Sequence, residues 1–498
     1  MEATEEQKKI FHFIKNRKEN LLISALAGAG KTTTVVHGLK LLPSDSKKIY
    51  LAFNKHIQME LKEKLPDDVY CYTFHGLGVN AIKNTYGDSI TFDEFKVDNH
   101  IKKKSKNWDL SSEFTEKGDI VEYLNKIKKF VNLCRQTVTL DKKYLPHLST
   151  KYDIELDEPK DHKRVFSVLE EMLNDRKTYD FTDMVFLPAI DNKIWTYQYD
   201  YIIVDEVQDL NRAQQYLLKK IIKKDKISKK VTGRLIAVGD YFQSIYGFSG
   251  VSDKSFSFFE NFPNTKTLPL TITFRCAKEI VKEAQKIVPT IQSKPDAIDG
   301  IVREGSVLDE PESGDFVLCR TTTPLIKLFF HYLLQGKKAT IKGSDIGLSL
   351  ENMIEGHKTI AQLMAYYKNK LKNYEIELRR KGILKYEEDN GYNILFDNVM
   401  ALDFMAKLSK DIDDLKGKVK KIFSDELHGI ILSTIHKSKG LEADRVFIAR
   451  PDKLPLPTKK AWQYQQELNL KYVAITRAKK ELVFDNTWID DDQEGEIT

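Results

Sequence analysis

The chain has few cysteines, and none of them lie close together. Its four cysteines, Cys71, Cys134, Cys276 and Cys319, are spread over 498 residues, and no CxxC pair occurs. Zinc sites and disulfide frameworks need cysteines at short or regular spacing, so the pattern favours neither. Thiols used in this way fit a reducing compartment, and we therefore expect a cytoplasmic protein.

Long apolar runs and a strong charge of one sign are also missing. No run of about 18 or more apolar residues is present, so we expect no membrane-spanning helix. The first ten residues, MEATEEQKKI, are polar and charged, which is untypical of a signal peptide. The formal net charge is only +6, from 79 Lys and Arg against 73 Asp and Glu. Net charge alone is therefore weak evidence for a nucleic-acid partner.

The length and composition predict several compact units. At about 150 residues per unit, 498 residues correspond to roughly three or four of them. Hydrophobic residues make up 41% of the chain, which is enough to build a core in each unit. No internal repeat or low-complexity linker separates them.

The stretch with the clearest chemistry is Leu21–Thr34, LLISALAGAGKTTT. Its first four residues predict a short buried strand, and a loop of small residues follows. The loop ends in Lys31-Thr32, where we expect a helix to begin. This is the pattern of a phosphate-binding loop, with Ala25 at the place of the usual first glycine. A tight strand-to-helix turn with a chance lysine is the alternative.

Such a loop binds phosphate for physical reasons. Small residues allow backbone N–H groups to turn inward around phosphate oxygens, and the helix N-terminus adds a positive dipole end. Lys31 can reach the β- and γ-phosphates, and the Thr32 hydroxyl can ligate Mg²⁺. The predicted nucleotide contacts here are Ala27, Gly28, Ala29, Gly30, Lys31, Thr32 and Thr33.

Carboxylates follow a second apolar run, Tyr201–Val204. Asp205 comes directly after it and can hold Mg²⁺, and Glu206 can orient and deprotonate an attacking water. An isolated Asp-Glu pair after a strand means little. Together with a phosphate-binding loop, it indicates a site that hydrolyses nucleotides.

A third apolar run, Leu235–Gly239, leads into DYFQSIYGF. Gln243 in this segment is a candidate sensor of the γ-phosphate. Tyr246 and Phe248 are candidate surfaces on which bases stack. Core packing is the alternative for both aromatic residues, and the local sequence does not decide between the two.

The alternation of strands and helices predicts an α/β fold with parallel sheets. Helical periodicity replaces this alternation twice, which indicates two insertions. The lysines of the first insertion form either a basic face for phosphates or a solvated face. The predicted domains are a first α/β domain (1–94 and 181–264) with a helical insertion (95–180), and a second α/β domain (265–349 and 425–498) with a small helical insertion (350–424).

The order of the motifs resembles that of superfamily 1 (SF1A) DNA helicases of the UvrD/Rep/PcrA type. The matching stretches run from Gln7 to Arg477 and are TEEQ, ALAGAGKT, TFHGLG, IIVDEVQDL, VGDYFQSIYGF, TFR, STIHKSKGLE and YVAITRA. The resemblance implies two RecA-like P-loop motor domains, each a parallel sheet flanked by helices and each with a mainly helical insertion.

The resemblance also implies roles at the nucleotide. By analogy with the family, Gln7 reads the adenine, Phe274 stacks on it and Glu442 contacts the ribose. Gln7 has a local alternative, because Thr4-Glu5-Glu6-Gln7 is a capping box at the start of a predicted helix. Arg275 and Arg477 match the family's γ-phosphate arginines. The implied catalytic set is Lys31, Glu206, Gln243, Arg275 and Arg477.

Positions that match the family's contacts to single-stranded DNA occur in both motors. They are Phe53, Asn54, Phe74, His75, Tyr246, Phe248, Thr434 and His436. The chain departs from the family pattern at three places. Phe53 directly precedes Asn54, one place from the common position, Ser249 replaces a common arginine, and Ala443 stands where some members have an aromatic residue.

The implied function is an ATP-driven, Mg²⁺-dependent translocase that moves 3′→5′ on single-stranded DNA and unwinds duplex DNA. Its implied partners are single-stranded DNA, junctions of single- and double-stranded DNA, and replication, repair or nuclease proteins. We expect a monomer in the cytoplasm, associated with the nucleoid, or in a host's cytoplasm if a phage encodes it. One alternative is an ATPase motor or switch subunit of a nuclease, defence or replication complex. A DNA-binding protein with a decayed motor is another, and the intact motif residues argue against it.

Overall fold

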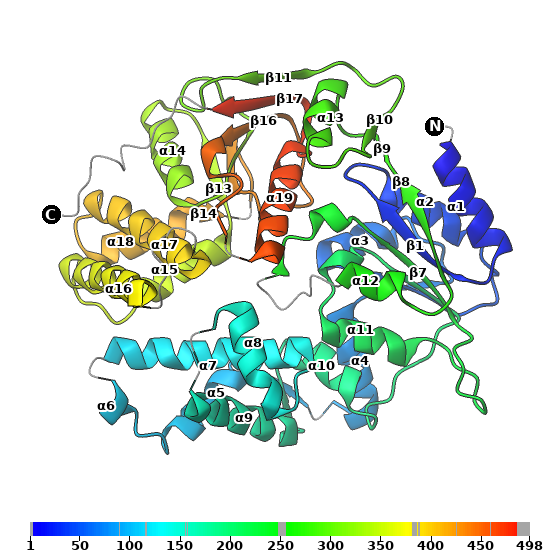
Figure 1. Ribbon diagram of the computed structural model, residues 1–498, viewed down its shortest axis with the longest axis horizontal. Helices are drawn as coiled ribbons and strands as arrows, with labels where there is room; N and C mark the ends of the chain where they lie inside the picture. Colours follow the sequence, from blue (N-terminus) through cyan, green and yellow to red (C-terminus); the bar gives the residue numbers. More distant parts are fainter. Residues whose placement is uncertain are drawn as a thin grey trace. The chain divides into compact units, whose positions relative to one another are not determined.

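The computed structural model in Figure 1 describes residues 3–88, 90–114, 117–154, 156, 158–247, 255–380, 386, 389–424, 426–458 and 460–485. The chain divides into two compact units. The first unit comprises Met1–Ala25 and Gly30–Leu270, and the second comprises Leu26–Ala29 and Thr271–Thr498.

The first unit is built on a six-stranded parallel sheet with the order β3-β2-β6-β7-β1-β8. Its strands are β1 (Asn20–Ala25), β2 (Lys48–Ala52), β3 (Val69–Thr73), β6 (Tyr201–Val204), β7 (Arg234–Gly239) and β8 (Thr265–Leu270). The central strands read as continuous apolar runs because helices cover both faces of the sheet. The predicted strand before the phosphate loop is confirmed as β1, with Leu21, Leu22 and Ile23 buried.

The edge strand β8 corrects one predicted boundary. Thr265 was predicted to begin the second α/β domain. In the structure, β8 pairs with β1 from Asn20–Thr265 to Ala25–Leu270, so it belongs to the first sheet. The first unit accordingly extends to Leu270.

Helices pack against the strands and helices of the first unit. They are α1 (Glu5–Asn16), α2 (Lys31–Leu39), α3 (Lys55–Lys62), α4 (Phe74–Tyr86), α10 (Asp183–Ile190), α11 (Arg212–Ile221) and α12 (Ser255–Glu260). Short 3₁₀ turns follow β6 and β7 at Val207–Asp209 and Tyr241–Gln243. The predicted capping box is confirmed on α1. Gln7 N donates to Thr4 Oγ1 at 3.2 Å, and Thr4 N donates to Gln7 Oε1 at 3.0 Å.

A helical subdomain, residues 95–180, is inserted in the first unit and includes the helices drawn in cyan and teal in Figure 1. Its helices are α5 (Lys96–Ser105), α6 (Leu110–Glu113), α7 (Lys117–Thr137), α8 (Leu145–Tyr152) and α9 (Pro159–Asn174), with a 3₁₀ turn at Lys142–Tyr144. It has its own apolar core, which includes Ile127, Phe130 and Val165. The strands β4 (Thr91–Phe92) and β5 (Thr178–Tyr179) pair where the chain enters and leaves the subdomain.

The helices α4 and α10 pack unusually closely. A Cβ atom added at Gly78 in α4 would lie 1.5 Å from the backbone oxygen of Met184 in α10. Only glycine lets the two backbones approach in this way. The first turns of both helices are thereby held close to each other, which matters for the site described below.

The second unit contains a seven-stranded parallel sheet with the order β11-β17-β16-β12-β15-β13-β14. Its strands are β11 (Ile301–Glu304), β12 (Phe316–Cys319), β13 (Ala339–Lys342), β14 (Phe423–Ser424), β15 (Ile430–Thr434), β16 (Ala443–Ala449) and β17 (Ala478–Asp485). A separate pair consists of β9 (Ile272–Thr273) and β10 (Gln292–Ser293).

Two groups of helices complete the second unit. The first group is α13 (Lys278–Gln285), α14 (Thr323–Leu334) and α19 (Ala461–Ile475), with a 3₁₀ turn at Pro451–Lys453. The second group is α15 (Ser344–Ile354), α16 (Ile360–Arg380), α17 (Asn390–Lys407) and α18 (Ile412–Ile422). One apolar core joins this second group to the sheet, as the packing of Leu402 and Leu415 with Ile341 and Leu432 shows. The second helical region therefore differs from the first, which has a core of its own.

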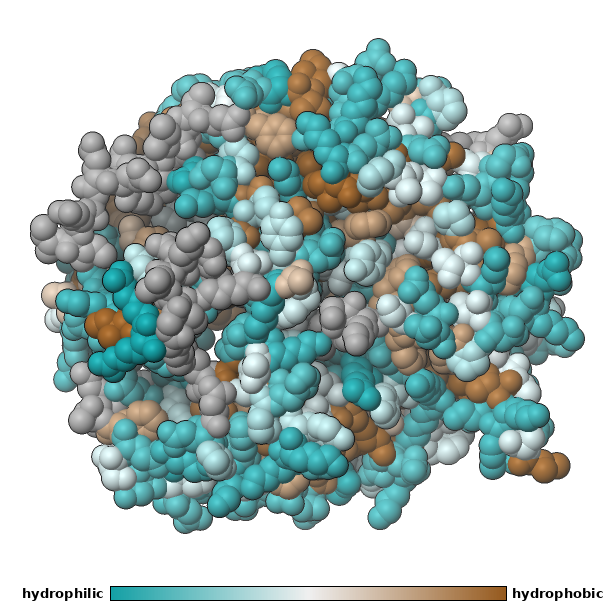
Figure 2. Space-filling model, viewed as in Figure 1, coloured by the Kyte–Doolittle hydropathy of each residue, from teal (hydrophilic) through white to brown (hydrophobic). Residues whose placement is uncertain are grey.

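Figure 2 shows hydrophilic side chains over much of the visible face. Within the described ranges, no helix has both the length and the apolar character needed to cross a membrane. All four cysteines are buried free thiols.

The close crossing of α4 and α10 gives a prediction about stability. We expect Gly78→Ala to lower the free energy of unfolding by about 1–3 kcal/mol, because the new methyl group would collide with backbone rather than with a movable side chain. The matched control is Gly417→Ala inside α18, where a Cβ meets nothing within 4 Å. That change should be neutral or stabilise by up to about 1 kcal/mol. Urea unfolding followed by circular dichroism measures both, and equal effects would contradict the packing described here.

Candidate functional site

The strand order of the first sheet brings together the predicted phosphate and metal residues of the first unit. In the order β6-β7-β1, Asp205 and Glu206 follow β6, Asp240 follows β7, and Lys31 begins the helix after β1. The carboxyl ends of parallel strands lie at one edge of a sheet, and ligands bind at that edge in open α/β folds.

Lys31 and Glu206 are in direct contact. The Lys31 ammonium lies 3.0 Å from Glu206 Oε1, and the two side chains are 13% and 19% exposed. Asp205 is more deeply buried. Its Oδ1 accepts a hydrogen bond from the Glu206 N–H at 2.8 Å, and its Oδ2 accepts one from the Tyr50 hydroxyl at 3.2 Å. Glu206 has a φ of 51°, in the left-handed region that non-glycine residues rarely adopt, and such backbone strain is commonly found at functional sites.

Burial and charge set the protonation of this group. Burial is the largest influence on Lys31 and lowers its pKa, but Glu206, Asp205 and Asp240 together outweigh burial and raise it above the ordinary value. The ammonium therefore stays charged. Burial, reinforced by Glu206, raises the pKa of Asp205 to about 6, and burial also raises that of Asp240 to about 6. The carboxyl groups of Asp205, Glu206 and Asp240 thus surround one ammonium. This arrangement favours the binding of a further cation beside Lys31.

Asp240 is a site residue that the sequence analysis missed. It is fully buried, and its Oδ2 accepts a hydrogen bond from Gln243 Nε2 at 2.6 Å. Its backbone N–H donates to Gln208 Oε1 at 3.0 Å. The predicted sensor Gln243 is therefore oriented by a carboxylate that also acts on Lys31. The sequence did contain an indication of this role, because Asp240 directly follows an apolar strand, as Asp205 does.

The phosphate loop has the backbone that its sequence predicts. Gly28 and Gly30 have φ angles of 69° and 72°, and Gly30 is the N-cap of α2. In the first turn of α2, Thr32 is half-buried and Thr33 is exposed. Because Gly30 precedes α2 directly, the N-terminus of this helix faces the loop.

Residues Leu26–Ala29 of the phosphate loop belong to the second unit. A Cβ atom at Gly28 would lie 2.5 Å from Thr273 Oγ1 and 2.6 Å from Arg275 Cβ. Phe274 N donates to the Gly28 carbonyl at 2.8 Å, and Ala27 N donates to the Tyr472 hydroxyl at 3.0 Å. The predicted nucleotide residues Gly28, Phe274 and Arg275 are therefore adjacent.

The Gln7 side chain has two hydrogen-bond partners within the first unit. Its Oε1 takes part in the capping box of α1, and its Nε2 donates to Thr34 Oγ1 at 2.9 Å. Thr34 lies in α2, one turn after the loop. Gln7 is thus held against the helix that begins at the phosphate loop, and its predicted role at adenine remains a prediction.

The arginines and the glutamate of the second unit also cluster. Arg275 Nε lies 2.5 Å from Glu442 Oε2, and Lys479 Nζ lies 2.9 Å from Glu442 Oε1. Arg275 Nη1 donates to the Thr476 carbonyl at 3.2 Å, next to Arg477 in the chain. Burial is the largest influence on Glu442 and raises its pKa, but Lys479 and Arg275 outweigh burial and lower it. Arg477 is buried and donates to the carbonyls of Val473 and Leu441, each at 3.0 Å.

The predicted DNA residues of the first unit separate into different environments. Phe74 is only 2% exposed and packs in the core of the first sheet, so its ring is not presented to a ligand, and the prediction of a DNA contact at Phe74 is corrected. Asn54 is exposed, and its Oδ1 caps α3 by accepting from Ile57 N at 2.9 Å. Phe53 and Tyr246 are half-buried. Phe248, like Ser249, lies outside the described residues.

His75 stacks on an aromatic residue that the sequence analysis missed. The rings of His75 and Phe181 have centroids 3.7 Å apart and an interplanar angle of 19°. Phe181 is 63% exposed, so part of its ring is open to solvent. Burial lowers the pKa of His75 to about 4, so the imidazole is neutral at pH 7. A signal for Phe181 was its position between two acidic residues just before a helix.

Thr434 and His436 lie at the carboxyl end of β15 in the second unit. Thr434 is buried and His436 is half-buried. Burial is the main cause that lowers the pKa of His436 to about 3, and Arg320 and Lys437 lower it further. This side chain is therefore a neutral group at pH 7, suited to hydrogen bonding rather than to charge pairing with phosphate.

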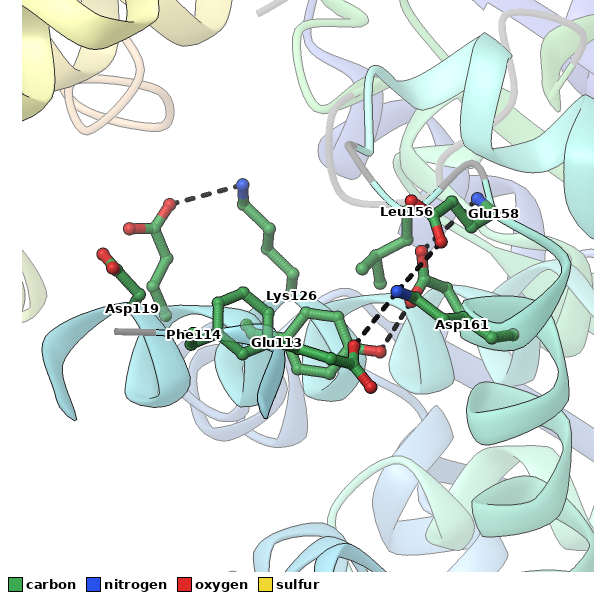
Figure 3. Close-up of a pocket in the computed structure, with 10 residues that line it drawn as sticks. Glu113, Phe114, Asp119, Lys126, Leu156, Glu158 and Asp161 are labelled. Atoms are coloured by element: carbon green, nitrogen blue, oxygen red, sulfur yellow. Dashed lines mark hydrogen bonds and ion pairs between the residues drawn. The ribbon is translucent and has the colours of Figure 1, made fainter. Parts of the chain in front are cut away.

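A cavity of about 400 Å³ lies within the helical subdomain (Figure 3). Its lining includes Glu113, Asp119, Glu158 and Asp161, and none of its lining residues is a predicted site residue. At least three of these carboxylates bind neighbouring side chains: Arg164 contacts Glu113, Lys160 contacts Glu158, and the Tyr123 hydroxyl donates to Asp161. An acidic lining disfavours phosphate, so this cavity is not a candidate for a nucleotide.

Comparisons with known proteins agree with the geometry. The UvrD/REP helicase N-terminal domain matches residues 3–264, and the UvrD-like helicase C-terminal domain matches residues 429–484. F-box DNA helicase protein 1 of Schizosaccharomyces pombe is 27% identical over 97% of this chain and 57% of its own length. ATP-dependent DNA helicase Rep of Buchnera aphidicola is 28% identical over 57% of this chain and 42% of its own length. ATP-dependent DNA helicase PcrA of Staphylococcus aureus is 26% identical over 55% of this chain and 38% of its own length.

The chain spans about half the length, or less, of the curated relatives named above. The N-terminal family alone covers more than half of the 498 residues, from the capping box of α1 to the residue before β8. This chain is therefore a member of the UvrD/REP helicase family.

Proposed function

We propose that this chain is an ATP-dependent DNA helicase, which hydrolyses ATP, translocates 3′→5′ on single-stranded DNA and unwinds duplex DNA. The observation that carries the proposal is the contact between Lys31 and Glu206, 3.0 Å apart at the carboxyl edge of a parallel sheet. It joins a phosphate-loop lysine to a carboxylate suited to activate water, in a chain of a helicase family.

The Lys31–Glu206 contact suggests how the site prepares for hydrolysis. ATP phosphates would compete with Glu206 for the Lys31 ammonium, because the phosphates and the Glu206 carboxylate are both negatively charged. Glu206 Oε1, once displaced from Lys31, could accept a proton from the attacking water, while Gln208 Nε2 still donates to Glu206 Oε2 at 2.5 Å. Gln243, which donates to Asp240, would sense the γ-phosphate in the same site.

Mg²⁺ fits the residues beside Lys31. This ion is usually held by one or two carboxylates together with substrate phosphates rather than by a cage of protein ligands. Asp205 and the Thr32 hydroxyl would hold Mg²⁺ together with ATP. When bound, Mg²⁺ neutralises charge that develops on the phosphates.

The second unit supplies the other proposed nucleotide contacts. Arg275 and Arg477 would meet the γ-phosphate, Phe274 would stack on the adenine that Gln7 reads, and Glu442 would contact the ribose. The adjacency of Gly28, Phe274 and Arg275 supports this assignment. Arginine suits the task because its planar, permanently charged fork can bind two phosphate oxygens at once.

Two motor domains would alternate their grip on DNA as ATP binds and is hydrolysed. We assign the motors to residues 1–94 with 181–270 and to residues 271–349 with 425–498. Phe181, which is exposed and stacks on the half-buried His75, would offer a surface on which a base can stack, and base stacking ignores sequence. Phe53, Asn54, Tyr246, Phe248, Thr434 and His436 remain proposed DNA contacts.

The first test removes the groups that act on phosphate and water. We expect Lys31→Ala and Glu206→Gln to abolish ATP hydrolysis, because one change removes a charge that neutralises phosphate and the other removes the base. Glu206→Gln should still bind ATP and DNA, since it is nearly isosteric. Steady-state hydrolysis and nucleotide binding are the measurements. Glu375→Gln, which breaks an ion pair with Arg379 on the surface of α16, is the matched control and should leave both unchanged. Wild-type turnover in Glu206→Gln would exclude Glu206 as the base.

The second test concerns the arginines of the second unit. We expect Arg275→Ala and Arg477→Ala to reduce DNA-stimulated hydrolysis by roughly 10³–10⁵, the range for arginine fingers in other phosphoryl-transfer proteins, with a smaller loss of ATP affinity. Lysine should rescue poorly because it keeps the charge but not the fork. Arg477 is buried, so circular dichroism must first show that each variant is folded, and Arg379→Ala on α16 is the surface control. Near-normal oligo-dT-stimulated turnover in both folded alanine variants would contradict the proposed roles.

A further inference from the structure

Four charged side chains are buried together where the helical subdomain joins the first sheet. They are Lys96 in α5, Arg135 in α7, Asp180 just before α10, and Asp183 at its first residue. Their exposed fractions are 1%, 0%, 5% and 2%. We call these four residues the junction cluster.

The junction cluster is continuously hydrogen-bonded. Arg135 Nη1 donates to Asp180 Oδ1 at 2.7 Å and to Asp183 Oδ1 at 2.9 Å. Lys96 Nζ donates to the other oxygen of Asp183 at 2.7 Å. Two cations therefore balance two anions. Burial is the largest influence on the Arg135 pKa and lowers it, but the two carboxylates outweigh burial and raise it, so the guanidinium stays charged.

Stability alone is a poor reason for such a cluster. Removing charges from water is costly, and an apolar cluster of similar volume often stabilises a protein as well or better. The cluster also leaves Arg135 Nε buried without a hydrogen-bond partner among the described residues. Directional bonds do, however, fix geometry in a way that apolar contacts do not. The question is which geometry they fix.

The two aspartates lie on either side of Phe181 in the chain. Asp183 N donates to Asp180 Oδ1 at 2.8 Å, so the segment between them forms a closed turn. On the other side of Asp180, Tyr179 is fully buried, and the Lys96 ammonium lies 5.6 Å from its ring centroid. The backbone is thus held at residues 179, 180 and 183, while the Phe181 ring is directed to the surface.

The partner of Phe181, His75, lies in a helix that packs against α10. His75 lies in the first turn of α4, and Gly78 lets α4 approach the backbone of α10 directly. The junction cluster thus adjoins Phe181 in the chain, and the close crossing lies in the same helix as His75. Their rings meet at a centroid distance of 3.7 Å.

We propose that the junction cluster is a positioning device for the His75–Phe181 stack, and that it makes the helical subdomain and this DNA-stacking surface move as one piece. The inference rests on the proposed function, because it takes the stack to be a surface for a base of single-stranded DNA. Lys96, Arg135, Asp180 and Asp183 act through Phe181 and do not touch DNA themselves.

A double-mutant cycle on DNA binding tests the proposal. Phe181→Ala should weaken binding of oligo-dT at fixed salt by roughly 5- to 150-fold, the loss of one stacking contact. Arg135→Met should give a loss of similar size in the wild-type background and little further loss in the Phe181→Ala background. Arg135→Lys should recover part of the affinity. If Arg135→Met does not fold, Asp180→Asn, which keeps the side-chain volume, takes its place in the cycle.

The matched control is Arg164→Met in the same subdomain. Arg164 donates hydrogen bonds to Glu113 and to the Tyr123 hydroxyl. Neither of these bonds involves Phe181 or the junction cluster. It should disturb the subdomain without changing DNA affinity. Losses from Arg135→Met and Phe181→Ala that multiply, or an equal loss from Arg164→Met, would overturn the proposal, because a merely structural role gives those results.

A readout without DNA separates this inference from the proposed function. Amide hydrogen exchange of residues 178–190, measured by mass spectrometry, should become faster in Arg135→Met and stay unchanged in Arg164→Met. Faster exchange in a protein that does not bind oligo-dT would leave the positioning role intact and refute the proposed function. Unchanged exchange in Arg135→Met, in a protein that does bind oligo-dT, would refute the positioning role alone.

Discussion

The contact between the Lys31 ammonium and the Glu206 carboxylate is the constraint on which the account of the first unit depends. It requires β1 and β6 to end at the same edge of one parallel sheet with only β7 between them. It also requires a charged lysine in a largely buried place, which three neighbouring carboxyl groups secure. The helical subdomain enters the chain between β3 and β6, so it can be inserted without disturbing this edge.

The sequence was sufficient for the parts of the fold in which local pattern and tertiary environment agree. Strands buried on both faces are continuous apolar runs, and β1, β6 and β7 were therefore visible, as was the capping box of α1. The strand β8 was misplaced for a physical reason. It has a neighbour on one side only, and most of its residues are not buried, so TKTLPL lacks the apolar run that marks a central strand.

The candidate site could be predicted where chemistry follows directly from strand ends, as it does for Lys31, Asp205 and Glu206. It could not be predicted where contacts join residues far apart in the chain. Arg135 and Asp180 are 45 positions apart, and nothing in either local sequence names the other. Phe74 and His75 show the same limit, because adjacent residues at a helix start point in different directions. One ring enters the core and the other faces Phe181.

The central claim is that ATP hydrolysis moves this chain along single-stranded DNA. Stopped-flow fluorescence with oligo-dT of increasing length and a dye at the 5′ end tests it most directly, with heparin present to trap released protein. The account predicts a signal from arrival at the 5′ end whose delay grows linearly with oligonucleotide length and which requires ATP and Mg²⁺. A time course that does not depend on length, in a protein that hydrolyses ATP and binds the same DNA, would contradict it.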